Sequence, residues 1–109
     1  MELKSIDELK DVFEKYDGKE EVIIFKFSPV CPISRRIENE FDDWFSKHKR
    51  EVKLYKVNVI AARTVSNFIA DEFSITHESP QLLWFDKELK VKSHTSHYNI
   101  DETFLNNNL

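Results

Sequence analysis

Helical and strand-like patterns of apolar residues alternate along the first two thirds of the chain. Apolar residues recur at helical spacing over residues 6–16, 32–48 and 62–73, which predicts three helices. Between them lie two runs of β-branched and aromatic residues, 22–27 and 52–59, and these predict strands, the first buried on both faces. Strands joined by helices of this length favour parallel pairing through right-handed crossovers.

Polar residues and the single glycine predict where the helices begin and end. Ser5 and Glu8 have the spacing of a capping box, and Gly18 follows the first helix, where a left-handed residue is favoured. Pro32 suits the first turn of the long helix because its missing N–H is not needed there. The basic residues 47–50 complement the dipole at the far end and are interpreted as a solvated helix terminus. The apolar stripe of this helix is predicted to contain Ile33, Ile37, Phe41, Trp44, Phe45 and His48.

The last third of the chain predicts a hairpin and a short helix. Strands at 81–85 and 89–94 are separated by a polar turn, and lysines alternate along the second strand, which protects a sheet edge from further pairing. Asp101 is positioned to cap a final helix, after which residues 106–108 are expected to fray. Residues 1–109 are predicted to form one domain.

The composition excludes several kinds of site. A Walker loop needs two glycines and a dinucleotide fingerprint needs three, whereas this chain has one. Its single cysteine, Cys31, excludes an intrachain disulfide and a zinc site built from several thiolates. A net charge of -4 gives no bulk attraction to nucleic acid. No apolar run approaches the roughly 20 residues of a membrane helix, so we expect a cytoplasmic protein that contacts no membrane.

Cys31 is the candidate nucleophile. It lies at the turn from the first strand into the long helix, where ligand and redox sites of α/β sheets collect. A thiolate there is stabilised by unpaired backbone N–H groups and by the helix dipole. Burial as an inert cysteine is the alternative, which the strand-turn-helix placement disfavours. Ser34, one turn along, either donates a hydrogen bond to the thiolate or faces solvent.

Charged residues near Cys31 have two interpretations each. Arg35 and Arg36 either add positive potential and grip the carboxylates of an anionic thiol, or are ordinary exposed helix arginines. His77 precedes the proline loop and either approaches Cys31 or is a solvated or internally satisfied histidine. No metal site is expected, because nothing in the sequence fixes a ligand geometry for the histidines.

Three segments resemble the monothiol bacilliredoxins in order and spacing: 28–34 (Ser-Pro-Val-Cys-Pro-Ile-Ser), 77–81 (His-Glu-Ser-Pro-Gln) and 93–97 (Ser-His-Thr-Ser-His). The resemblance extends over about residues 22–100. It implies an α/β, thioredoxin-like three-layer fold, with a central mixed sheet of about four strands flanked by helices. It also implies a cis bond before Pro80, although the local sequence alone favours trans.

The resemblance implies that Cys31 acts on mixed disulfides between client proteins and the low-molecular-weight thiol bacillithiol. Ser34 occupies the place of the second cysteine of dithiol thioredoxins, so a monothiol cycle reset by an outside thiol is expected. S-thiolated clients and bacillithiol, as a co-substrate, are the expected partners, with no tightly bound cofactor. The expected catalytic residues are Cys31, Ser34 and Pro80, and the expected substrate-binding residues are Pro32, Arg35, His77 and Ser79.

The alternative function is a non-catalytic one. A thioredoxin-like binding or redox-sensing module keeps the fold, and its cysteine is thiolated as a protective cap without turnover. A thiol pKa near that of free cysteine, or a sulfur closed to alkylating reagents, would favour the module. The sequence leaves this choice open.

Overall fold

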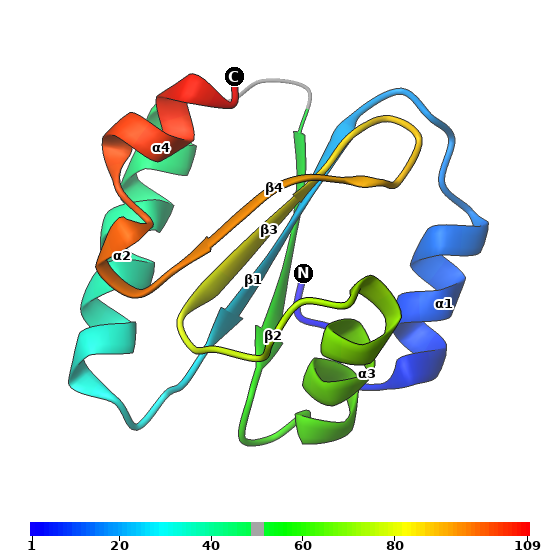
Figure 1. Ribbon diagram of the computed structural model, residues 1–109, viewed down its shortest axis with the longest axis horizontal. Helices are drawn as coiled ribbons and strands as arrows, with labels where there is room; N and C mark the ends of the chain where they lie inside the picture. The colour runs from blue at the N-terminus through cyan, green and yellow to red at the C-terminus, as the bar shows by residue number, and fades with distance from the viewer. Residues whose placement is uncertain (49–51) are drawn as a thin grey trace.

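A computed structural model describes residues 1–48 and 52–109 and contains one four-stranded sheet between two layers of helices (Figure 1). The strand order is β2-β1-β3-β4. The β1–β2 pair is parallel, whereas β1–β3 and β3–β4 are antiparallel, so the sheet is mixed as predicted. The strands are β1 (Glu21–Phe27), β2 (Val52–Asn58), β3 (Gln81–Phe85) and β4 (Val91–Ser96).

The helices cover both faces of the sheet. Helices α2 and α4 lie on one face and α1 and α3 on the other (Figure 1). The parallel β1–β2 connection runs through α2, the crossover expected from the periodicity. The helices are α1 (Ile6–Glu14), α2 (Pro32–Lys47), α3 (Arg63–Phe73) and α4 (Glu102–Asn107), with a 3₁₀ turn, η1 (His97–Asn99), before the last.

Strand β1 contributes to the core on both of its faces. Ile23, Phe25 and Phe27 pack toward α2 and α4, and Val22 and Ile24 pack toward α1 and α3. Side chains alternate across a strand, so a central strand with a helix layer on each side must be apolar at almost every position. This explains the apolar run at 22–27 and makes Lys26, the one charged residue within it, conspicuous.

Two details at the first helix differ from the predictions. The helix ends at Glu14 instead of residue 16, and Gly18, with φ of 76°, lies in the bend that leads into β1. The left-handed backbone is therefore needed in the connection and not at the helix end. Ser5 caps the helix by accepting from the N–H of Glu8, but the Glu8 carboxylate accepts from the N–H of Lys4 in place of Ser5.

The first inward-facing residue of α2 is Ser34, one position after the predicted Ile33. Ile33 is 45% exposed, and Ser34 instead faces the interior, three residues before Ile37. Either position is compatible with helical spacing to Ile37, and the sheet contacts choose between them. Of the basic end predicted at 47–50, Lys49 and Arg50 lie outside the described residues.

The prediction that residues 106–108 fray was wrong. Asn106 and Asn107 belong to α4, and Asn106 Oδ1 accepts a hydrogen bond from Trp44 Nε1 at 2.9 Å. The Asn108 side chain accepts from Ser93 Oγ and donates to the backbone carbonyl of Phe104. Side-chain amides thus hold the chain end against α2 and β4. Within the described residues, no helix combines the length and apolarity needed to cross a bilayer.

Candidate active site

The topology brings four chain segments to one edge of the sheet. Strand β4 is antiparallel to β3, which is antiparallel to β1, so β1, β2 and β4 end at the edge where β3 begins. Figure 1 shows this edge at the lower left of the sheet. The turn carrying Cys31, the β2–α3 connection, the loop ending at Pro80 and the turn η1 all lie there.

Cys31 is the N-cap residue of α2. Its backbone is extended, with φ of -98° and ψ of 117°, and its carbonyl accepts the first helical hydrogen bond, from the N–H of Arg35 at 3.0 Å. Cys31 is partly exposed, its thiol is free, and it makes no capping hydrogen bond. Cys31 therefore lies at the positive end of a 16-residue helix, whose first backbone N–H groups have no hydrogen-bond acceptor within the helix. Pro32, at the first helical position, is exposed.

Ser34 stabilises the turn that carries Cys31. Its side chain is fully buried, and its Oγ accepts a hydrogen bond from the backbone N–H of Ser28 at 2.9 Å. The solvent-facing alternative is therefore wrong, because the hydroxyl satisfies a backbone donor at the end of β1. A hydrogen bond from Ser34 to the Cys31 thiolate stays a prediction.

The loop that precedes β3 reaches the same edge. The Ser79–Pro80 bond is cis, whereas the local sequence favours trans. Pro80 is buried and its carbonyl accepts from the backbone N–H of His97 at 2.9 Å. Lys26 of β1 is paired with Gln81 of the antiparallel strand β3. Continuing this register by one residue places Pro80 beside Phe27, and Phe27 precedes Cys31 by four residues. Ser79 Oγ is buried and has no hydrogen-bond partner in the described part of the chain.

Lys26 is a site residue that the sequence analysis missed. It belongs to β1, its side chain is completely buried, and its Nζ donates to the carbonyl of Ser66 in α3 at 3.0 Å. The same Nζ lies 3.3 Å from Nδ1 of His77, and Ser66 Oγ lies 2.9 Å from that nitrogen. His77 is thus internally satisfied on one side. The signal in the sequence was a lysine inside a run predicted to be buried on both faces.

Alkaline pH is expected to stabilise the fold through Lys26. Burial lowers the pKa of this ammonium from 10.5 to about 8, so between these values the unfolded chain holds a proton that the folded chain has lost. The free energy of unfolding therefore rises with pH in this window. Relative to Lys26→Met, the wild type should gain about 2 kcal/mol between pH 8 and pH 10, measured by urea unfolding. A constant difference between the two proteins would contradict a buried, titrating lysine.

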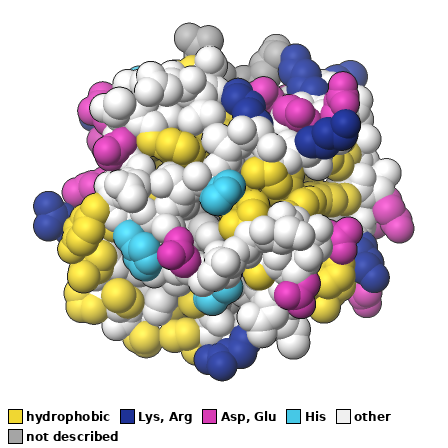
Figure 2. Space-filling model, viewed as in Figure 1, with side chains coloured by type: hydrophobic (Ala, Val, Ile, Leu, Met, Phe, Trp, Pro, Cys, Tyr) yellow, Lys and Arg dark blue, Asp and Glu magenta, His cyan; other side chains and the backbone are white. Residues whose placement is uncertain are grey.

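Exposed apolar side chains share the edge of the sheet that carries Cys31. Apart from the chain ends Met1 and Leu109, the large hydrophobic residues exposed in the described structure all lie in segments at this edge. Figure 2 shows hydrophobic side chains gathered at the lower left of the molecule, the side on which α2 begins. We call this set the apolar rim, and it consists of Val30, Ile33, Ile60 and Tyr98.

A hollow of about 380 Å³ adjoins the cysteine turn. Arg35 is exposed there and forms no ion pair with any described residue, whereas Arg36 pairs with Glu40 at 3.3 Å. An unpaired guanidinium beside a reactive sulfur can take a carboxylate from a ligand. The hollow is lined by Pro29, Val30, Pro32, Arg35, Arg36 and Asn39.

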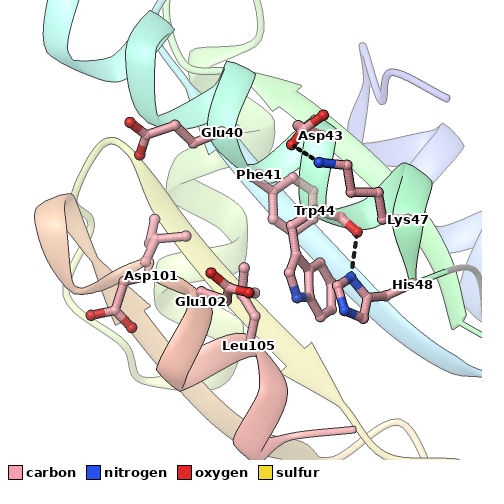
Figure 3. Close-up of a pocket in the computed structure, with 10 residues that line it drawn as sticks. Glu40, Phe41, Asp43, Trp44, Lys47, His48, Asp101, Glu102 and Leu105 are labelled. Atoms are coloured by element: carbon pink, nitrogen blue, oxygen red, sulfur yellow. Dashed lines mark hydrogen bonds and ion pairs between the residues drawn. The ribbon is translucent and has the colours of Figure 1, made fainter.

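A second hollow, of about 310 Å³, lies between α2 and α4 at the far end of α2 from Cys31 (Figure 3). Several carboxylates and Trp44 line this hollow. Lys47 forms an ion pair with Asp43 at 3.0 Å, and His48 Nδ1 is hydrogen-bonded to the backbone carbonyl of Trp44. None of the residues predicted for the site lines this hollow. Among the described residues, no three His, Cys, Asp or Glu side chains gather as a metal site would require.

Solved structures similar to this chain share its fold. A protein described as having a thioredoxin fold is 28% identical, with a TM-score of 0.83, covering 98% of this chain and 90% of its own. The thioredoxin of Fasciola hepatica is 20% identical with a TM-score of 0.74, covering 98% and 93%. Thioredoxin O2 of Arabidopsis thaliana is 20% identical with a TM-score of 0.73, covering 98% and 88%. The predicted thioredoxin-like fold is confirmed.

The family comparison covers nearly the whole chain. Residues 1–105 match the family described as Monothiol bacilliredoxin BrxC. This match includes the cysteine turn, the proline loop and the hairpin that follows it. Together with the fold, it assigns a thiol redox role to a protein with one cysteine. The chain belongs to the monothiol bacilliredoxin BrxC family.

Proposed function

We propose that this protein is a monothiol thiol-disulfide oxidoreductase that removes bacillithiol, or a similar low-molecular-weight thiol, from mixed disulfides of client proteins. The observation that carries the proposal is the position of Cys31: a partly exposed, unpaired thiol at the N-terminus of a long helix, beside a hollow with an unpaired arginine. Cys31 is the nucleophile in this scheme, and the client groove lies between the cysteine turn and the loop of Ser79 and Pro80 at the same edge of the sheet.

The cycle consists of two exchanges. The Cys31 thiolate attacks the small-thiol sulfur of the mixed disulfide, so that the disulfide bond breaks, a new one forms to Cys31, and the client leaves as a thiolate that takes a proton from water. A second thiol then attacks the sulfur bound to Cys31. This releases the Cys31 thiolate and a low-molecular-weight disulfide, which carries away the oxidising equivalents. No other cysteine exists in the chain, so the second thiol must come from outside.

The apolar rim supports a protein as the client. Four exposed apolar side chains in the segments at the edge that carries Cys31 favour contact with the chain that flanks a thiolated cysteine. The backbone of Ser79 adds hydrogen-bonding groups for an extended segment, as in recognition by strand addition.

Arg35 supports an anionic small thiol. It leaves the first turn of α2 beside the hollow, and no described carboxylate neutralises it. A guanidinium binds a carboxylate through two parallel hydrogen bonds, which selects for orientation as well as charge. We infer that Arg35 holds the carboxylate part of the small thiol while its sulfur faces Cys31.

The test uses one client protein thiolated separately with bacillithiol, glutathione, coenzyme A and cysteamine, which has no carboxylate. Mass spectrometry is expected to show release of the reduced client and a reversible adduct on Cys31, with bacillithiol fastest. Arg35→Gln should lower kcat/KM for the bacillithiol form about fivefold, equivalent to ~1 kcal/mol, and leave the cysteamine form unchanged. Lys47→Gln removes the same charge at the far end of α2 and should change neither.

Three outcomes would count against this scheme. An adduct on Cys31 that forms once and is not removed when free small thiol is added, so that no more than one client is reduced per protein, would favour the thiolated sensing module. Absence of any adduct would contradict both functions. An equal loss for the bacillithiol and cysteamine forms in Arg35→Gln would show that Arg35 does not recognise the carboxylate.

A further inference from the structure

A buried polar cluster lies beneath the loop that carries Pro80. It joins three elements: Lys26 from β1, Ser66 from α3 and His77 from the loop. Lys26 and Ser66 are both almost completely shielded from solvent, whereas His77 is exposed and reaches the cluster through Nδ1. Polar groups in such a position are costly unless they are hydrogen-bonded, so each of these contacts constrains the others.

The geometry fixes the protonation state of His77. The Lys26 ammonium has no lone pair and can only donate, so His77 Nδ1, 3.3 Å from it, must accept. The Ser66 hydroxyl, 2.9 Å away, converges on the same nitrogen. A neutral ring with its proton on Nε2 satisfies this arrangement. A protonated ring removes the acceptor and sets a second positive charge beside Lys26.

The charges around His77 favour the neutral ring. Partial desolvation of the ring where it meets the cluster lowers the pKa of His77, and the positive charges of Lys26 on β1 and Arg63 on α3 lower it further, while Glu78 in its own loop acts in the opposite direction. Asp71 of α3 lines the surface groove that His77 also lines. Protonation of His77 therefore requires pH values below those of an ordinary histidine.

Besides the cluster, contacts from β4, η1 and β3 hold the same loop. Ser96 Oγ donates to the carboxylate of Glu78, and the backbone N–H of His97 donates to the carbonyl of Pro80 at 2.9 Å. Gln81 Nε2 donates to the carbonyl of Thr76 at 2.9 Å, which closes the loop on itself. The side chain of His77 therefore adds an attachment of this loop to β1, the strand that leads to Cys31, before the β1–β3 pairing begins at Gln81.

We propose that Lys26 and His77 are positioning residues for thiol-disulfide exchange: neutral His77, held by Lys26 and Ser66, fixes residues 77–80 against the end of β1 next to Cys31. This inference rests on the proposed function, because it concerns the groove used in that reaction. Protonation of His77 releases the loop from Lys26 and slows exchange. Lys26 touches neither substrate nor the reacting sulfur and acts through the loop.

The first test is a pH profile. His77→Asn keeps a short side-chain acceptor but does not titrate, so the ratio of wild-type to variant exchange rates cancels the ionisation of Cys31 that both proteins share. We expect this ratio to fall at least about threefold between pH 7 and pH 4.5, as His77 becomes protonated in the wild type alone. His48→Asn, at the far end of α2, should give a flat ratio. A flat ratio for His77→Asn would overturn the proposal.

The second test compares two lysines on neighbouring strands. Lys26→Met should slow exchange at pH 7 about fivefold or more and speed hydrogen exchange of the His97 amide, which donates to Pro80. Lys56 of β2 is also partly buried but pairs with Glu38 at 2.7 Å and Asp42 at 2.8 Å, away from the loop. Lys56→Met should leave both readouts unchanged. Equal behaviour of the two variants would show that any effect is one of general stability.

A third measurement needs no substrate. Nitrogen-15 NMR of the wild type at pH 7 should show His77 with an unprotonated Nδ1 and a proton on Nε2. A proton on Nδ1 would overturn the proposed cluster. If the wild type shows this tautomer and releases no client from any mixed disulfide, the proposed function fails and the cluster stands. If the wild type catalyses thiol exchange while His77 carries its proton on Nδ1, the proposed cluster fails and the proposed function stands.

Discussion

Cys31→Ser is expected to abolish release of small thiols from client proteins while changing the free energy of unfolding by no more than about 0.5 kcal/mol. The serine hydroxyl is not ionised at neutral pH and forms no disulfide, so neither exchange of the cycle can begin. No second cysteine is available to replace the lost sulfur. Because the thiol is partly exposed and makes no capping hydrogen bond, its replacement leaves the packing of α2 intact.

The measurement follows reduced client by mass spectrometry and unfolding by urea titration in the same preparation. Ser46→Ala is the matched control, since Ser46 is an exposed residue near the end of the same helix, and it should retain full activity. Residual turnover by the Cys31→Ser variant above that of the buffer would contradict the assignment of Cys31 as the nucleophile. A large loss of stability would contradict the open position of the thiol described above.

Phe25→Ala is expected to lower the free energy of unfolding by about 3–5 kcal/mol. Phe25 lies in β1, is completely buried, and stacks on Phe41 of α2 with 4.8 Å between ring centroids. Truncation leaves a cavity where the central strand meets its helix layer, and neighbouring strands on both sides prevent collapse. The total stability of a domain of this size is about 5–15 kcal/mol, so the variant should be partly unfolded at 37 °C.

Urea unfolding followed by circular dichroism measures this loss. Tyr98→Ala removes a ring of similar size that is 65% exposed, and it should cost no more than about 0.5 kcal/mol. Equal losses in the two variants would show that the contact between β1 and α2 does not dominate the core. The comparison also separates effects on stability from effects on the apolar rim, to which Tyr98 belongs.

The sequence predicts the fold well because its strongest signals are local. The apolar run at 22–27 and the helical stripe that begins after Cys31 each fall within one element, and together they place the cysteine at a strand-to-helix turn. The same locality explains the error at Ile33. Helical spacing alone allows either Ile33 or Ser34 to face the sheet, and only contacts with β1 and its turn decide.

Features that depend on distant partners could not be predicted. Lys26 meets Ser66 and His77, which are 40 and 51 positions away in the sequence, so a buried lysine could be suspected but its partners could not be named. Asn106 was predicted to fray because its hydrogen-bond partner, Trp44, lies 62 positions away in the sequence. The identity of the small thiol depends on contacts with another molecule, so its assignment stays a proposal.

The bond between Trp44 and Asn106 has an optical consequence. The ring centroids of the two tryptophans lie 6.4 Å apart in one core. Trp84 is completely buried on strand β3, whereas Trp44 donates a hydrogen bond to the side chain of Asn106 in α4. Detachment of the last helix would break the hydrogen bond of Trp44 and uncover part of the core that holds both indoles, whereas β1 and α2 would still cover Trp84 on their side. Emission from this pair therefore distinguishes a loosened chain end from global unfolding, with no added label.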